Sequence, residues 1–172
     1  MRRRGSMVTE KYSQEELVYK YKDEVESLSR YIPWFESKTA EMVSGMYKSQ
    51  EGQHNFSFPV YDSTLLAFIN EVGMTSFMNR NHQYVYIRYH IKSHEDEWRA
   101  IDNATIMTMD VIGAILSKYV LGGITKPALW KEGVEYELYL RCLKKAKSII
   151  EFWDKPLPEN KELLRADTRL MQ

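Results

Sequence analysis

The chain has 172 residues, of which 44% are hydrophobic and 28% charged, and its 24 basic residues balance its 24 acidic ones. This length suits one domain, and the composition is typical of a water-soluble globular protein. No apolar run approaches the roughly 20 residues that cross a bilayer, and a neutral chain lacks the basic surface of a general nucleic-acid binder.

The cysteine content indicates a reducing compartment. The single cysteine, Cys142, has no second thiol within the chain to pair with, and no secretory signal pattern precedes the first helix. We therefore expect a cytoplasmic protein. Because Cys142 lies inside an amphipathic pattern, we interpret it as a small buried hydrophobic residue rather than a nucleophile.

The ends of the chain differ from its middle. Residues 1–12 are expected to form a disordered arm that is partly a cloning remnant, since Gly5-Ser6-Met7 is a common junction. Without the three arginines of that arm, 24 − 3 = 21 basic residues face 24 acidic ones, a balance of −3. Residues 13–153 should form one globular domain, and residues 154–172 a tail or a marginal helix.

The first half of the chain is predicted to form helices and one extended segment. Ser13-Gln-Glu-Glu16 is a capping box that predicts a helix over 14–31, ending before a proline. A short helix over 37–46, a polar surface loop over 48–55 and an extended stretch over 56–61 follow. Asp62 or Ser63 should then cap a helix that Gly73 stops.

In the next segment the hydrophobic pattern changes from a helical period to a period of two residues. In Gln83–Ile91, the apolar positions 85, 87, 89 and 91 alternate with 84, 86, 88 and 90. Alternation of β-branched and aromatic residues predicts a strand, which needs a partner in Thr75–Met78 or Phe56–Tyr61. His94–Glu97 is predicted as a charged loop.

The last third is apolar and helical. We expect a long helix over 104–121 ended by Gly122-Gly123, and a short helix capped by Thr125 and interrupted by Gly133. A final helix should span 134–153. The predicted fold is α+β but mainly α, with four or five helices and a small antiparallel hairpin or a sheet of two to three strands.

Two groups of residues are candidate sites. His90 and His94 are four residues apart and precede Glu95 and Glu97, so they could ligate zinc on a helix. Because His90 is predicted to lie at the end of a strand, the two histidines would not share a helix face. Structural or solvated histidines are then the simpler interpretation. Aromatic and cationic side chains form the second, ligand-binding group: Trp34, Tyr84, Tyr86 and Arg88. No catalytic residue and no cofactor is assigned.

Three sequence blocks of the chain occur in an order that is known from a protein family. They are Tyr31–Glu36, Phe58–Tyr61 with Leu65–Val72, and Ala114–Gly123 with Ala128–Gly133 and Leu138–Leu143. In this order the chain resembles a small bacterial and phage family of domains of unknown function (DUF6508-like). The family's third block carries an arginine and then an arginine–phenylalanine pair. Lys118 and Tyr119 occupy the positions of this arginine–phenylalanine pair, and the resemblance therefore implies a ligand-facing role for them. Ile115 occupies the position of the first arginine.

These observations lead to three hypotheses. The leading one is a non-catalytic interaction module of bacterial or mobile-element origin, with a protein partner bound in a groove beside Trp34, Tyr47 and Tyr84–Tyr89. The alternatives are a small metal-dependent hydrolase or nuclease-like enzyme and a phage-defence or nucleic-acid-associated regulator. The sequence does not indicate an oligomeric state.

Overall fold

The computed structural model describes residues 13–48 and 57–154. Within them, helices dominate and two strands form an antiparallel hairpin, as the α+β, mainly α prediction stated. The helix count is nine rather than four or five in these ranges, because several short helices flank the long ones. The predicted arm and nearly all of the predicted surface loop and tail fall outside the described residues, while Lys48, the first residue of the predicted loop, ends strand β1 (Ser44–Lys48).

The N-terminal half holds the elements that surround the core. In chain order they are α2 (Gln14–Ser29), α3 (Ile32–Glu36), α4 (Ala40–Val43), β1 (Ser44–Lys48), β2 (Ser57–Tyr61) and α5 (Ser63–Gly73). Both reciprocal hydrogen bonds of the predicted capping box begin α2, from Glu16 N–H to Ser13 Oγ and from Ser13 N–H to Glu16 Oε2. Asp62 caps α5 by accepting from the Thr64 N–H at 2.7 Å.

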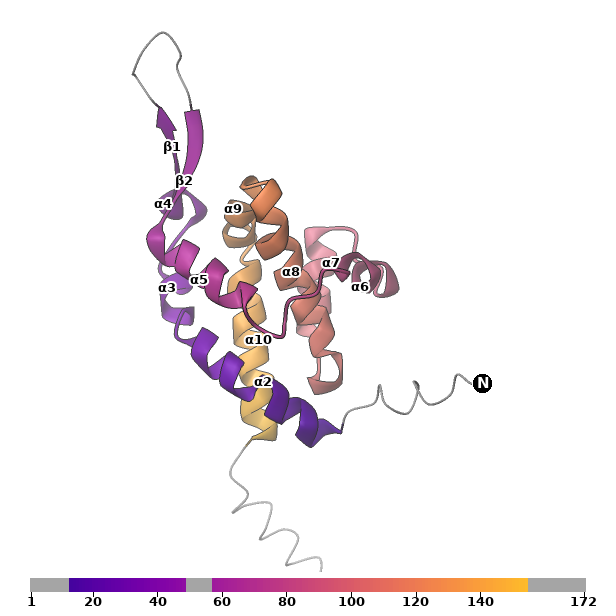
Figure 1. Ribbon diagram of the computed structural model, residues 1–172. Coiled ribbons are helices and arrows are strands. Elements are labelled where there is room, and N and C mark those ends of the chain that lie inside the picture. Colours follow the sequence, from indigo (N-terminus) through magenta and orange to yellow (C-terminus); the bar gives the residue numbers. More distant parts are fainter. Residues whose placement is uncertain (1–12, 49–56, 155–172) are drawn as a thin grey trace, which may run out of the picture.

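The C-terminal half supplies the centre of the molecule. Its elements are α6 (His82–Arg88), α7 (His94–Asp102), the 3₁₀ turn η1 (Ile106–Thr108), α8 (Met109–Thr125), α9 (Ala128–Glu135) and α10 (Leu138–Trp153). Helix α8 is buried on nearly every side and packs against α5, α6, α7, α9 and α10. Helix α10 lies against α2 on its other side (Figure 1).

Contrary to the sequence-based prediction, one apolar stretch does reach a membrane-spanning length, and burial explains its composition. Ile106–Thr125 is long and apolar enough to cross a membrane by length and composition, yet 67% of its most apolar window is buried inside the protein. A core helix that is covered on all sides has this same composition. The structure is therefore compatible with a soluble protein.

The predicted strand over 83–91 is wrong. This segment forms α6, which packs against α8. The alternating set does not share one environment: Val85 and Ile91 are buried, whereas Ile87 is 70% exposed. Alternation over so few residues does not separate a strand from a short helix, and the partner of β2 is instead β1.

The glycines of the third block do not end helices as predicted. Helix α8 continues through Gly122 and Gly123 to Thr125, and Thr125 caps no helix because its hydroxyl bonds back to the Gly122 carbonyl. A Cβ on Gly123 would lie 2.1 Å from the Trp130 indole, and one on Gly133 would lie 2.2 Å from the Tyr139 ring. These glycines therefore allow rings to lie directly against a helix backbone.

Candidate functional site

A buried carboxylate forms the centre of the candidate site. Glu97 lies in the first turn of α7, where the Ser93 hydroxyl caps the helix by accepting from the Asp96 N–H at 3.1 Å. The segment predicted as a charged loop is thus the start of a helix. The helix turns Glu97 inward, so that its side chain is only 1% exposed.

Three donors converge on this carboxylate. The Tyr86 hydroxyl donates to Oε2 at 2.6 Å, and the Tyr119 hydroxyl lies 2.9 and 3.0 Å from the two carboxylate oxygens. His94 Nδ1 lies 2.7 Å from Oε1. Glu97 therefore joins α6, α7 and α8 through hydrogen bonds to an ionised group, which are stronger than neutral ones.

Both tyrosines remain donors over the ordinary pH range. Burial, reinforced by the negative charge of Glu97, raises the pKa of Tyr86 and of Tyr119 far above the usual value for a phenol. A protonated hydroxyl is the form that donates to a carboxylate. The cluster therefore pairs each donor with an acceptor.

His94 connects the carboxylate cluster to α9. Its Nε2 lies 3.1 Å from Glu132 Oε1, so each ring nitrogen faces a carboxylate oxygen. The imidazole also stacks on the Tyr136 ring, with centroids 3.6 Å apart and planes at 18°. His94 is thus fixed by side chains of the protein on both edges and on one face.

The two histidines of the metal hypothesis lie in different settings. His90 is exposed in the turn after α6, where its φ of 55° is left-handed, and His94 is the first residue of α7. Because they do not share a helix, their four-residue spacing does not align them. Among residues 13–48 and 57–154, no group of three His, Cys, Asp or Glu side chains is arranged to hold a metal ion.

A lysine links the buried cluster to a pocket. Lys118 Nζ lies 3.7 Å from Glu97 Oε2 and 5.1 Å from the ring centroids of both Tyr86 and Tyr119. These contacts hold the ammonium group by charge and by the faces of two aromatic rings. Lys118 and Tyr86 also form part of the pocket wall.

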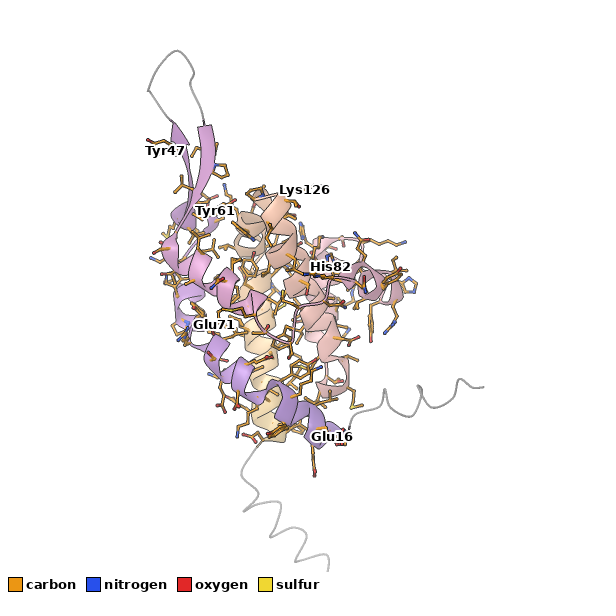
Figure 2. All side chains as sticks on the ribbon, viewed as in Figure 1. Glu16, Tyr47, Tyr61, Glu71, His82 and Lys126 are labelled. Carbon is orange, nitrogen blue, oxygen red and sulfur yellow. The ribbon has the colours of Figure 1, made fainter. Side chains whose placement is uncertain are left out.

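The pocket lies between α6, α8 and α9 and has a volume of about 610 Å³. Its lining combines basic and apolar side chains, and none of these lining residues is acidic: His82, Gln83, Tyr86, Ile87, Lys118, Gly122, Thr125, Lys126 and Leu129. Figure 2 labels His82 on α6 and Lys126 just after α8. Burial, and then the charge of Lys118, lowers the pKa of His82. The wall is therefore suited to an anionic group next to an apolar one.

The structure brings together some of the predicted ligand-binding residues and separates others. Tyr86, Lys118 and Tyr119 form one cluster, with Tyr119 fully buried behind the other two. Tyr84 is exposed on α6 outside the pocket lining, and Arg88 lies 3.9 Å from Asp110.

The predicted groove is not formed. Trp34 packs against Phe35 in α3, on the opposite side of the central helices from α6, and Tyr47 lies on the hairpin (Figures 1 and 2). These two residues and Tyr84–Tyr89 therefore do not surround one binding site.

Glu97 is the most connected residue of the site, and the sequence indicates it only as a companion of the two histidines. The sequence alone does not indicate His82, Lys126 or Leu129 as site residues. The signal for α7 was present, because Ser93 precedes Asp96 by the three residues typical of a helix start. No local pattern marks His82, Lys126 and Leu129 as neighbours, since α6, α8 and α9 meet only in the folded protein.

Cys142 has the inert character expected from its pattern. Its side chain is fully buried in α10, and burial raises the pKa of the thiol. A thiol that stays protonated and shielded is a poor nucleophile.

Comparison of the chain with family models, with curated proteins and with solved structures gives no match.

Proposed function

We propose that this protein is a non-catalytic interaction module, and that the pocket between α6, α8 and α9 receives an acidic, partly apolar segment of a protein partner. The observation that carries the proposal is the pocket lining. Lys118 and Lys126 supply positive charge around an apolar surface, and no carboxylate is among the residues that line the same space.

The apolar part of the surface favours a segment with a hydrophobic side chain. Leu129 and Ile87 line the pocket, and Ile87 is 70% exposed although it is a large aliphatic residue. Covering such a side chain contributes roughly 25 cal/mol for each Å² of apolar area that leaves water. A partner residue that is apolar therefore adds affinity that a simple anion lacks.

The buried cluster prepares the pocket for binding. Glu97, Tyr86 and Tyr119 restrict Lys118 before any ligand arrives. A side chain that is already ordered loses less conformational entropy on binding. We infer that Glu97 is a positioning residue for Lys118 and does not itself contact the partner.

The access of the ionisable groups supports binding rather than catalysis. The Glu97 carboxylate is 1% exposed and faces three donors of the protein, and His94 faces carboxylates through both ring nitrogens. General acid–base catalysis needs a group within hydrogen-bond reach of the substrate. The ionisable groups that line the pocket are instead His82, Tyr86, Lys118 and Lys126.

A pair of matched peptides tests the proposal. Fluorescence anisotropy would compare labelled acetyl-Glu-Leu-Phe-Glu-amide with its neutral counterpart, in which glutamine replaces both glutamates. We expect the acidic peptide to bind more tightly. K118Q should weaken its binding about fivefold, which corresponds to about 1 kcal/mol for a charged hydrogen bond at a partly exposed site.

Two controls define the outcome. K92Q changes an exposed lysine outside the pocket lining and should leave binding unchanged. Equal binding of both peptides, or equal losses in K118Q and K92Q, would contradict the proposal. Binding of a small apolar anion such as anilinonaphthalene sulfonate, without binding of the acidic peptide, would assign the pocket to a small molecule instead.

A further inference from the structure

The β1–β2 hairpin extends beyond the ends of the helices (Figure 1). Its base is fixed to them: the Tyr61 ring meets Trp130 edge to face at 5.5 Å, and its hydroxyl donates to the Pro127 carbonyl. Further out, Met46 and Val60 are 59% and 44% exposed. These two side chains point to opposite faces of the hairpin, because Met46 pairs with Pro59 and Val60 with Gly45. A hairpin of two strands is marginal alone, so pairing of its edge with a further strand would stabilise it.

The register shows which backbone groups face outward. The Asp62 N–H donates to the Val43 carbonyl at 2.8 Å, immediately beside the Ser44–Tyr61 pair. Hydrogen-bonded and non-bonded pairs alternate along an antiparallel ladder. Met46 and its partner Pro59 therefore belong to a non-bonded pair, in which the backbone groups of each residue point away from the other strand.

Within residues 13–48 and 57–154 the sheet has two strands, and its two outer edges are not equivalent. Pro59 has no N–H, and its position in the register places this gap on the outer edge of β2. Proline on an edge strand prevents further pairing there. The outer edge of β1 presents the N–H and C=O groups of Ser44, Met46 and Lys48 without such a gap. Strand β1 is thus the edge that accepts another strand.

We propose that β1 pairs in antiparallel fashion with β1 of a second copy of this chain, around a twofold axis at Met46. This register places Met46 opposite its own equivalent and Ser44 opposite Lys48 of the second copy. Because a twofold axis repeats each backbone bond, the outward groups of Met46 complement themselves. The result is a four-stranded sheet.

Backbone geometry favours the antiparallel twofold arrangement. In a parallel ladder, a residue whose backbone groups point at the partner strand lies opposite one whose groups point away, so two copies that meet at the same β1 edge could not place Met46 opposite Met46. The antiparallel arrangement does so, and it pairs the outward N–H and C=O groups of Met46 with those of its equivalent. Pro59 then lies on both outer edges of the sheet, so association stops at two copies.

The state of association of the full chain tests this pairing. Sedimentation equilibrium from about 1 to about 500 µM covers the range in which small interfaces dissociate, and we expect a monomer–dimer equilibrium. M46K places like charges on the axis and leaves the hairpin bonds in place, so it should weaken dimerisation at least about tenfold. The control M74K changes a methionine that is 75% exposed at the end of α5, and it should dimerise like the parent.

Hydrogen exchange gives a second measurement. The Met46 amide should exchange slowly only at protein concentrations that populate the dimer, whereas the inward-facing Tyr47 amide should be protected in monomer and dimer alike. P59A restores an N–H to the β2 edge and should permit species larger than a dimer. A chain that stays monomeric throughout, or a dimer that M46K leaves intact, would overturn the proposal. A P59A protein that stops at the dimer would show that Pro59 does not limit assembly.

Discussion

Replacement of Glu97 by leucine tests whether the buried carboxylate stabilises the fold. Leucine has a similar size and fills the site, but it accepts no hydrogen bond. The Tyr119 hydroxyl would lose both carboxylate oxygens at 2.9 and 3.0 Å, and the Tyr86 hydroxyl its acceptor at 2.6 Å. We expect E97L to lower the free energy of unfolding by about 2–4 kcal/mol.

The magnitude follows from the burial of each donor. Tyr119 is fully buried, and an unsatisfied buried donor costs about 1–3 kcal/mol. His94 Nδ1 lies 3.4 Å from the Tyr119 hydroxyl and offers a longer, weaker replacement, which keeps this loss within that range. Tyr86 and His94 are half-buried, so water reaches them and each contributes about 1 kcal/mol or less. The sum is a large fraction of a typical domain stability of roughly 5–15 kcal/mol.

Urea unfolding followed by circular dichroism measures these losses for the parent and three variants. E97Q keeps an acceptor for the tyrosines and gives His94 a donor, so it should cost about 1 kcal/mol. The triple variant E97L/Y86F/Y119F removes the donors together with the acceptor. It should recover at least half of the E97L loss, because deleting both partners of a hydrogen bond is much less costly than deleting one.

Two results would refute this account of the site. The first is an E97L protein within about 1 kcal/mol of the parent, which would mean that water or other side chains satisfy the donors. The second is a triple variant no more stable than E97L, which would attribute the loss to packing. In either case Glu97 would not be the group that holds α6, α7 and α8 together.

Further predictions concern the core and its ionisable groups. G123A places a methyl group 2.1 Å from the Trp130 indole, so it should lower the free energy of unfolding by about 1–3 kcal/mol and red-shift the tryptophan emission. The raised pKa values of Tyr86 and Tyr119 predict that stability falls above about pH 10, since the unfolded chain then releases protons that the folded chain retains. Unfolding titrations should show this slope, up to about 1.4 kcal/mol per pH unit for each tyrosine, and Y86F/Y119F should reduce it. Cys142 should not react with a thiol reagent in the folded protein at neutral pH and should react once urea unfolds it, as absorbance would show; a fast reaction in the folded state would contradict its burial.

Local signals predicted the elements whose ends are marked by side-chain caps. Ser13 and Glu16 begin α2, and Asp62 begins α5, in the positions that the sequence indicated. The extended stretch ending at Tyr61 is also confirmed as strand β2. These signals work because the bonds that form a cap join residues only two or three apart in the chain.

Glycine and short alternating patterns were the weak signals. Gly122 and Gly123 suggested a helix end, but in the folded protein they make room for Leu129 and Trp130 of the next helix. A missing Cβ serves both purposes equally, and a single sequence does not distinguish them. The alternation around Val85 likewise suited either a strand or a helix, and packing of α6 against α8 decided for the helix.

The sequence by itself determined a mainly helical domain, its first capped helix, the extended segment at Pro59 and the buried character of Cys142. Only the tertiary structure decided that Glu97, Tyr86, Tyr119 and Lys118 form one cluster beside a basic pocket. The cause is that hydrogen bonds and charges at a buried site depend on distances between helices far apart in the chain. The pattern of a helix records which side is apolar, and it does not record which other helix that side meets.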